Sequence, residues 1–314
     1  MFEVVRYAAE QAGLWNAFVA KSKNATFLFD RNYMDYHADR FTDHSLMIYR
    51  RGRLFALLPA NERDGGVLES HGGLTYGGLV MSRGCTGADV EQAMRCICDY
   101  LRSHGFSRVL YKPTPWIYHR QPSEEDLYAL FAVCEARLVA RGLSSVICRD
   151  DRNEWFRIRL MGRRRAQEAG ITIQKTDHLE PFWQILTTNL KEKYNLLPVH
   201  TVEEMQLLKS RFPDNIRLIT AVKDGQTLGG TVLYVTPTVV HSQYIAASPE
   251  GKRLHALDLL FGEVIEQALQ QHPYFDFGIS TERDGEYLNA QLAYQKEGFG
   301  GRGLCYDHYE WKLS

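Results

Sequence analysis

The sequence lacks the features that mark membrane-spanning, fibrous and disordered proteins. No stretch approaches the roughly 18 consecutive apolar residues of a transmembrane helix, and no heptad pattern or low-complexity segment is present. Apolar residues make up 45% and charged residues 24% of the 314 residues, which is the balance of an ordinary globular chain. At roughly 150 residues per domain, this length predicts two domains.

An excess of either charge sign is also missing. The chain has 37 Lys and Arg against 38 Asp and Glu, which gives a formal net charge of -1. Without a global positive field to attract phosphates, nucleic acid is not expected as the main partner, and tRNA is the one exception considered below. The first residues lack a basic segment followed by a long apolar run, so we expect a cytoplasmic protein without a membrane span.

Cysteines are few and scattered along the chain. Of the six, only Cys96 and Cys98 are close in sequence, inside a helix predicted over residues 86–104. Side chains two residues apart on a helix point about 200° apart around its axis, which is a poor geometry for one metal ion. We therefore expect reduced structural thiols and no metal site, with a metal or redox site as the alternative.

Secondary-structure signals recur in a similar order in the two halves of the chain. Each half reads as helix, hairpin, further strand, helix and strand. We therefore predict an α+β fold with two similar domains, residues 1–152 and 153–314, each a mostly antiparallel mixed sheet flanked by helices. The tail from about residue 302 could pack back onto the first domain. In the second half we expect a hairpin over 216–234, strands over 239–246 and 274–278, and a helix over 254–271.

A glycine-containing loop connects the strand over 239–246 to the following helix. At such a junction, free backbone N–H groups and the helix dipole favour an anion, so the segment is a candidate pyrophosphate site. An ordinary strand–helix connection is the alternative. The candidate donor-binding residues are Ala247, Ser248, Gly251, Lys252, Arg253, Leu254 and His255.

Three passages, taken in order, resemble a known group of enzymes. They are Tyr76-Gly77-Gly78, the basic helix over residues 163–169, and Phe275-Asp276-Phe277-Gly278 followed by Gln295-Lys296-Glu297-Gly298-Phe299-Gly300. Their spacing is similar to that in the FemABX peptidoglycan aminoacyltransferases and related tandem GNAT acyltransferases, which implies two GNAT-like domains. Gln295 departs from the usual Phe. The acyl-CoA signature of GNAT proteins is kept strictly only at Arg253, since Ala256 and Asp258 occupy its glycine positions.

This resemblance implies transfer of an acyl group to an amine. The expected reaction uses acyl-CoA as donor and an amine of a small-molecule, cell-envelope, glycan or peptidoglycan precursor as acceptor. Two alternatives stay open. One is a Fem-type enzyme that uses aminoacyl-tRNA, and the other is a non-catalytic binding protein with the same fold, which the degraded acyl-CoA signature would favour.

Candidate catalytic residues lie on or after the two strands that flank the thioester in GNAT folds. His241 is the first choice of general base because an imidazole titrates near neutral pH. Tyr244 would face the opposite side of a regular strand unless a bulge resets the alternation. Asp276 stands between two phenylalanines, and the resemblance implies that Lys296 stabilises the oxyanion. Each candidate has an alternative explanation. His241 could be a partly exposed strand histidine, and Tyr244 could pack in the core. Asp276 could hydrogen-bond a nearby loop, and Lys296 could be a solvated lysine.

The remaining candidates are expected to bind the acceptor. The glycines around His71 permit close approach of the backbone to a ligand in a cleft between the domains, although a tight structural turn would explain them equally. Polar residues of the second half could bind the acceptor or simply be solvated. The candidate substrate-binding residues are His71, Gly73, Tyr76, Lys193, Glu282 and Asn289.

Overall fold

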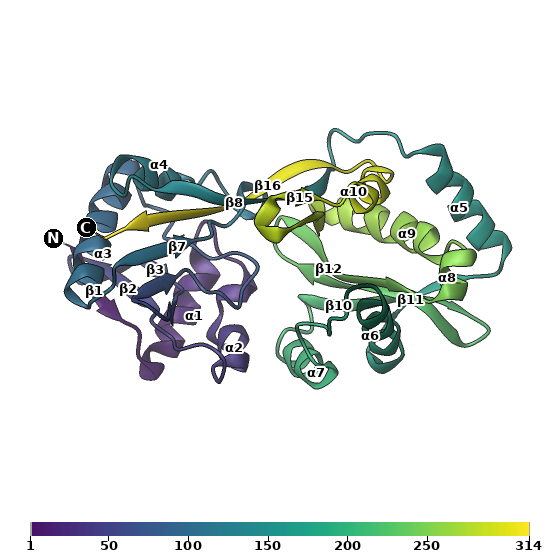
Figure 1. Cartoon of the computed structure of the whole chain (residues 1–314), viewed down its shortest axis with the longest axis horizontal. Coiled ribbons are helices and arrows are strands. Elements are labelled where there is room, and N and C mark those ends of the chain that lie inside the picture. The colour runs from purple at the N-terminus through teal and green to yellow at the C-terminus, as the bar shows by residue number, and fades with distance from the viewer. Residues whose placement is uncertain (1, 314) are drawn as a thin grey trace. The chain divides into compact units, whose positions relative to one another are not determined.

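The computed structural model describes residues 2–313, and the chain divides into two compact units (Figure 1). Unit 1 comprises Met1–Gly142, Arg283–Glu286 and Cys305–Ser314, and unit 2 comprises Leu143–Glu282 and Tyr287–Leu304. The division thus falls before the expected boundary at residue 152, because the strand β8 (Arg137–Cys148) begins in unit 1 and ends in unit 2. No helix among the described residues is both long and apolar enough to cross a bilayer.

Unit 1 contains two groups of paired strands. One is antiparallel in the order β1-β2-β3-β6, and the other runs β4-β5-β7 and then the end of β16 (Arg302–Lys312). The predicted hairpin is present as β2 and β3, and the predicted helix is α3. The other elements of this unit, in chain order, are β1 (Phe2–Arg6), α1 (Ala12–Lys21), α2 (Arg31–Met34), β2 (Leu46–Arg50), β3 (Arg53–Leu58), β4 (Asn61–Arg63), β5 (Val67–Glu69), β6 (Val80–Met81), α3 (Gly87–Ser103), β7 (Arg108–Tyr111) and α4 (Glu125–Ala132).

Unit 2 is built on the strand order β8-β13-β12-β11-β10-β9, with helices on both faces. Figure 1 shows α9 and α5 on one side of these strands and α6 and α7 on the other. Its elements are α5 (Arg157–Glu168), β9 (Thr172–Thr176), α6 (Glu180–Tyr194), α7 (Val202–Arg211), β10 (Ile216–Lys223), β11 (Gln226–Val235), β12 (Val239–Ala247), α8 (Pro249–Arg253), α9 (Ala256–Gln271), β13 (Tyr274–Ile279), β14 (Thr281–Glu282), β15 (Tyr287–Leu288) and α10 (Ala290–Glu297).

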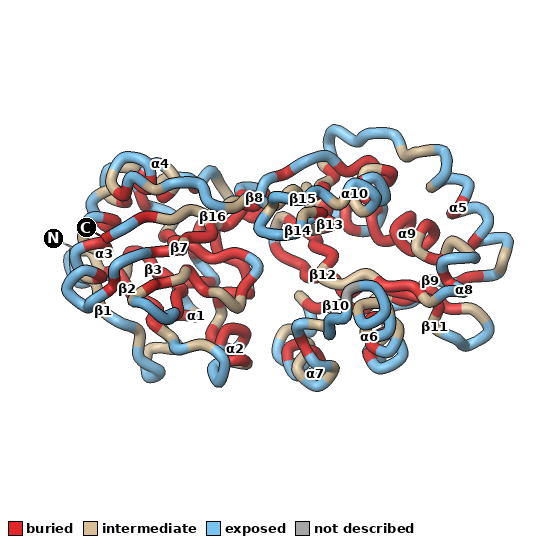
Figure 2. The backbone as a smooth tube through the Cα atoms, in the orientation of Figure 1, coloured by how far each residue is buried: buried red, intermediate tan, exposed pale blue. Residues whose placement is uncertain are grey.

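Strand alternation decides which side chains meet α9. Phe275 and Phe277 of β13 pack with Phe261 of α9 in the core, so Asp276 between them points to the opposite face. The buried residues of unit 2 concentrate in the strands β10 to β13 and in α9, whereas the outer side of α5 is exposed (Figure 2). Among the described strand pairs of unit 2, β12 and β13 run parallel, and the pairs β8–β13, β11–β12, β10–β11 and β9–β10 run antiparallel. The predicted α+β class with mixed sheets is therefore confirmed.

Two elements of unit 2 differ from expectation. The segment predicted as a loop after β12 contains the short helix α8, which begins because Ser248 Oγ accepts a hydrogen bond from the N–H of Gly251 at 3.0 Å. Helix α10 lies beyond the strand over 274–278, where no helix was expected. Its start is set by Asn289, whose Oδ1 accepts a hydrogen bond from the N–H of Leu292 at 3.1 Å.

Candidate active site

The two central strands of unit 2 diverge at a pair of polar residues. β12 and β13 are paired in parallel at Val239 with Tyr274, Val240 with Phe275, and His241 with Asp276. Within the described chain no later pair joins them, although β12 continues to Ala247 and β13 to Ile279. The last paired position therefore holds two of the four residues that were predicted to be catalytic.

A pocket of about 550 Å³ opens beside the separated strands. Apolar and aromatic side chains line it together with charged side chains. Both features suit a ligand that carries an acyl chain and polar groups. Its lining includes Arg159, Asn189, Lys252, Asp258, Phe277 and Lys296.

His241 and Asp276 form a hydrogen-bonded pair in the sheet. His241 Nδ1 lies 3.0 Å from Asp276 Oδ2, and Asp276 is fully buried. The other carboxylate oxygen accepts hydrogen bonds from Ser144 Oγ of β8 and from the N–H of Gly278 at 2.8 Å. A carboxylate held in this way keeps the imidazole proton on Nδ1 and leaves Nε2 as the basic nitrogen.

Gly278 gives the strand a conformation that other residues rarely adopt. Its φ is +77°, in the left-handed region, and a Cβ atom there would come within 3.2 Å of His241 Cε1. The register of β13 against β8 also shifts between Asp276 and Ile279. The glycine of the Phe-Asp-Phe-Gly passage thus turns the backbone directly after the carboxylate.

Lys296 reaches this turn from α10. Its Nζ donates hydrogen bonds to the carbonyl oxygens of Gly278 at 2.8 Å and Ile279 at 2.7 Å. Burial lowers the pKa of the ammonium to about 8, and the nearby Asp276 opposes this shift. Two of its three N–H groups are used in these bonds, so the third can donate to a ligand in the pocket that Lys296 lines.

Tyr244 lies in a different environment from the other three catalytic candidates. The register of β12 against β11 passes from Ser242 directly to Tyr244, so Gln243 forms a bulge that resets the alternation. The Tyr244 ring packs on Trp183 of α6, and its hydroxyl is 2.6 Å from His200 Nδ1. Burial raises the pKa of Tyr244 to about 12. The structure brings His241, Asp276 and Lys296 together and leaves Tyr244 apart.

The predicted donor-binding segment is only partly turned to the pocket. Ala247 and Lys252 line it, and Lys252 Nζ is 3.3 Å from Asn189 Oδ1 of α6. Arg253 instead pairs with Glu250 at 3.2 Å on the surface. The N–H groups of the segment are largely engaged by protein acceptors. Those with a described acceptor are the N–H groups of Ser248, Gly251, Lys252, Leu254 and His255.

A buried acid stands in the first turn of α9. Asp258 Oδ1 accepts a hydrogen bond from Arg159 Nη1 at 2.6 Å, and Oδ2 lies 3.1 Å from His255 Nδ1. Asp258 and Arg159 line the pocket, and Asp258 is only 3% exposed. The side chain of His255, a predicted donor-binding residue, therefore contacts this carboxylate and helps to hold it in place.

Of the predicted acceptor-binding residues of unit 2, Lys193 and Glu282 are exposed and Asn289 is half-buried. Lys193 lines the pocket from α6. Asn289 Nδ2 donates a hydrogen bond to Glu282 Oε1 at 3.0 Å, so these two residues meet each other.

The three candidates of unit 1 are held by that unit's own packing. The His71 ring stacks on His37 with centroids 5.3 Å apart, and burial lowers the pKa of His71 to about 3, with His37 contributing further. A Cβ atom on Gly73 would meet His37 Nε2 at 2.5 Å. Tyr76 is buried, and its hydroxyl donates a hydrogen bond to Thr26 Oγ1 at 3.1 Å.

Sequence reasoning missed three residues of this site. Ser144 could not be found because only the antiparallel pairing of β8 with β13 brings it to Asp276. Asn189 reaches the pocket from α6, where no local pattern marks it. Asp258 had a signal, because an acid at a glycine position of the acyl-CoA signature is unexpected.

Nothing in the described part of the chain forms a candidate metal centre: no group of three or more His, Cys, Asp and Glu side chains is placed to hold an ion.

Comparison with protein families matches part of this chain. Residues 156–287 match the family described as the acetyltransferase (GNAT) domain. This segment lies mostly in unit 2 and includes His241, Asp276 and the donor-binding segment. No curated protein sequence matches the chain significantly.

Solved structures match the whole chain. FemX is similar with a TM-score of 0.68 at 11% identity, over 99% of this chain and 97% of FemX. A tandem GNAT protein from the clavulanic acid biosynthesis pathway has a TM-score of 0.51 at 14% identity, over 100% of this chain and 99% of that one. The C-terminal domain of a putative lysylphosphatidylglycerol synthetase from Agrobacterium fabrum is similar with a TM-score of 0.61 at 13% identity. The match covers 98% of this chain and 92% of that domain. The chain has a FemX-like tandem GNAT fold, and the resemblance is confirmed.

Proposed function

We propose that this tandem GNAT-fold chain is an acyltransferase that moves an acyl group from acyl-CoA to an amine of a cell-envelope or glycan precursor. One observation carries the proposal. The strands β12 and β13 part directly after the His241–Asp276 pair, and the resulting gap borders a pocket that Lys296 also lines. The Lys296 ammonium group therefore lines the pocket, and the His241–Asp276 pair lies at the last paired position of the two strands that border it.

The proposed chemistry needs a base and an oxyanion stabiliser. His241 Nε2 accepts the proton of the attacking amine while Asp276 holds the imidazole through Nδ1. The amine forms the new C–N bond, and the free N–H of Lys296 stabilises the negative charge on the carbonyl oxygen. The C–S bond then breaks, and the thiolate of CoA leaves and takes up the proton that His241 accepted from the amine, which restores the neutral imidazole.

Lys252 and Arg253 give a matched test of where the donor binds. Both are cationic neighbours in α8, but Lys252 lines the pocket and Arg253 pairs with Glu250 outside it. We therefore expect Lys252→Ala to weaken binding of the donor, whereas Arg253→Ala should leave it unchanged.

Thermal unfolding with acetyl-CoA, free CoA and a longer acyl-CoA measures this binding directly. A ligand at 100 times its Kd should stabilise the folded chain by about 2.7 kcal/mol. The expected result is a higher Tm in the wild type and in Arg253→Ala, and a smaller rise in Lys252→Ala. No rise with any CoA species would contradict acyl-CoA as the donor.

One observation favours a second candidate, an aminoacyl-tRNA-dependent transferase. The carboxylate of Asp258, which is paired with Arg159, occupies the first turn of α9 inside the pocket, at a glycine position of the acyl-CoA signature. A carboxylate there can attract the cationic amino group of an aminoacyl ester. This candidate predicts binding of charged tRNA that weakens steeply with salt, and no effect of CoA on the Tm.

A further inference from the structure

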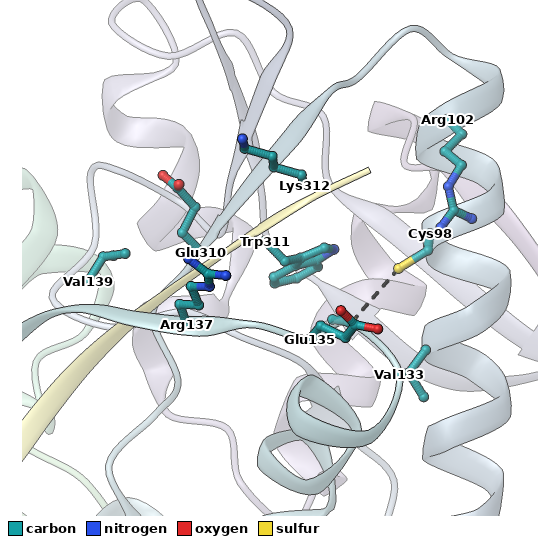
Figure 3. A pocket seen from close by; sticks show the side chains of 10 residues that line it. Cys98, Arg102, Val133, Glu135, Arg137, Val139, Glu310, Trp311 and Lys312 are labelled. Carbon is teal, nitrogen blue, oxygen red and sulfur yellow. Dashed lines mark hydrogen bonds between the residues drawn. The ribbon is translucent and has the colours of Figure 1, made fainter. Parts of the chain in front are cut away.

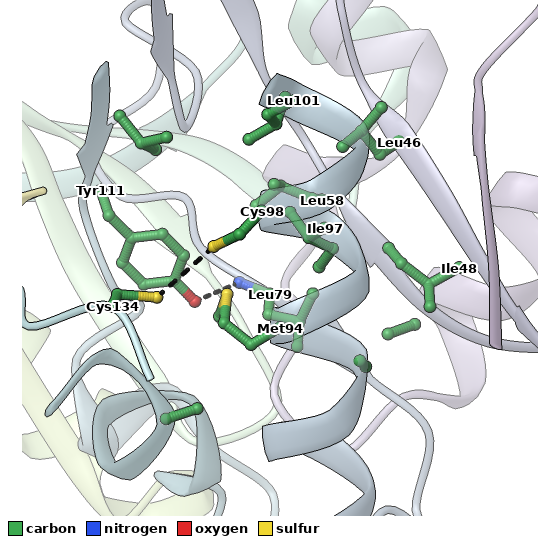
Figure 4. Close-up of a cluster of buried hydrophobic side chains, with 14 of the residues drawn as sticks. Leu46, Ile48, Leu58, Leu79, Met94, Ile97, Cys98, Leu101, Tyr111 and Cys134 are labelled. Atoms are coloured by element: carbon green, nitrogen blue, oxygen red, sulfur yellow. Dashed lines mark hydrogen bonds between the residues drawn. The ribbon is translucent and has the colours of Figure 1, made fainter. Parts of the chain in front are cut away.

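Two cysteine thiols of unit 1 lie in contact at the edge of its core. Cys98 is on α3 and Cys134 follows α4, and their Sγ atoms are 3.8 Å apart (Figure 4). Helices α3 and α4 pack against each other, and this packing brings Cys134, two residues beyond the end of α4, to Cys98. Because a disulfide has an S–S distance of about 2.05 Å, the sulfurs must approach by less than about 2 Å.

A separate pocket gives small molecules access to this pair. It has a volume of about 450 Å³, and both cysteines line it. Figure 3 shows Cys98 and Trp311 among its lining residues. Charged side chains of both signs surround it, including Arg102 and Glu135. The sulfur atoms therefore border a cavity large enough for a small polar molecule, although each cysteine is less than 9% exposed.

The contact makes the two thiols chemically unequal. The hydrogen bond with Cys134 lowers the pKa of Cys98, and Trp311 and Arg102 act in the same direction. The same bond, together with burial, raises the pKa of Cys134. Cys98 therefore loses its proton first, and the thiolate is the form that attacks a disulfide.

We propose that Cys98 and Cys134 are a redox-active dithiol that a small organic disulfide of the glutathione class converts into an intramolecular disulfide. The Cys98 thiolate attacks one sulfur of the small disulfide, forms a mixed disulfide and releases one thiolate. Cys134 then loses its proton, attacks the sulfur of Cys98 and releases the second thiolate. The protein loses two electrons and two protons, and the small disulfide becomes two thiols. None of these steps uses a residue of the pocket in unit 2.

The chain offers a matched control for this site. Cys96 lies on the same helix two residues from Cys98, so its side chain points about 200° away around the axis. Cys85 is buried, and its Sγ lies 3.3 Å from Ser82 Oγ. Cys96→Ser therefore removes a nearby thiol and keeps the proposed pair.

The experiment treats the intact protein with glutathione disulfide, blocks free thiols by alkylation and maps the peptides by mass spectrometry. In the wild type and in Cys96→Ser we expect a peptide that links Cys98 to Cys134 and disappears on reduction. In Cys134→Ser we expect a mixed disulfide with glutathione to accumulate on Cys98. In Cys98→Ser, modification of Cys134 should be at least tenfold slower than that of Cys98 in Cys134→Ser.

Three results would overturn the proposal. The first is wild-type protein whose far-UV spectrum is unchanged but which yields no Cys98–Cys134 peptide at any concentration of glutathione disulfide. The second is a linked peptide that instead joins Cys96 or Cys305. The third is modification of Cys134 in Cys98→Ser that is as fast as modification of Cys98 in Cys134→Ser. Since the first result needs only the wild type, a variant that fails to fold does not decide the outcome.

Discussion

Gly162 of α5 faces Asp258 of α9 so closely that a Cβ atom on residue 162 would overlap the Asp258 carboxylate. That carboxylate is the acceptor for Arg159 and the neighbour of His255. The absence of a side chain at residue 162 therefore makes room for a buried charge cluster at one end of the unit 2 pocket.

Gly162→Ala should destabilise unit 2, although alanine normally favours a helix. The added methyl group forces α5 and α9 apart or breaks the Arg159–Asp258 pair, which costs about 1 to 3 kcal/mol. Urea denaturation measures the loss. Gly13→Ala is the control, because Gly13 of α1 has open space around it and should tolerate alanine. Equal stabilities of the two variants would contradict the tight contact.

Asp276→Asn should reverse the tautomer of His241. The amide group of asparagine can donate to Nδ1, which places the imidazole proton on Nε2 and removes the base. We expect the rate of acyl transfer to fall about 10²-fold or more. Heteronuclear NMR of the imidazole nitrogens reads the tautomer without any substrate.

Ser144→Ala is the companion variant for that measurement. It removes a hydrogen bond to the other oxygen of Asp276 but keeps the carboxylate beside His241. The Nδ1–H tautomer should persist in this variant. A wild-type protein with the proton on Nε2 would contradict the proposed role of His241.

Lys296 should make activity and stability respond to pH in opposite directions. Burial lowers its pKa from 10.5 to about 8, so between these values the unfolded chain retains a proton that the folded chain has lost. The contribution of this lysine to the free energy of unfolding therefore rises with pH across that window. The transfer rate should fall above pH 8 as the ammonium disappears.

Lys296→Met tests both effects. The free energy of unfolding of the wild type, minus that of the variant, should grow by about 1 to 3 kcal/mol between pH 8 and 10.5 and stay level between pH 6 and 7. Urea titrations at fixed pH give this difference. A difference that stays constant up to pH 10.5 would show that Lys296 titrates normally.

Tyr244→Phe should affect stability more than catalysis. The hydroxyl contacts His200, and Tyr244 does not line the unit 2 pocket. Loss of this hydrogen bond should cost about 1 kcal/mol, and the transfer rate should change less than threefold. A large fall in kcat with an unchanged Tm would instead make Tyr244 a proton donor in the reaction.

Local patterns in the sequence predicted the strands β10 to β13 and the helix α9, but not the helices α8 and α10. Asp276 alternates with Phe275 and Phe277 in the sequence, and in β13 the acid lies on the face opposite the two rings. The family resemblance pointed to Lys296 although it lies eighteen residues beyond Gly278, on a helix that was not expected. These residues were predictable because each signal lies within one element or one motif.

Relations between distant elements were not predictable in this way. Ser144 meets Asp276 through the pairing of β8 with β13, and Cys98 meets Cys134 through the packing of α3 on the segment after α4. The bulge at Gln243 was foreseen only as a possibility, because no glycine or proline marks it. Such contacts depend on register and packing, which a single sequence does not encode locally.

The two units are not continuous stretches of chain, and this has a consequence for biosynthesis. Unit 1 includes residues after Cys305, and the strand β16 pairs with β7 at positions such as Trp311 with Val109. On a ribosome, the residues of unit 2 are therefore all synthesised before unit 1 can complete its sheet. Until then β7 exposes an unpaired edge, and a chain cut before residue 305 would keep that edge open permanently.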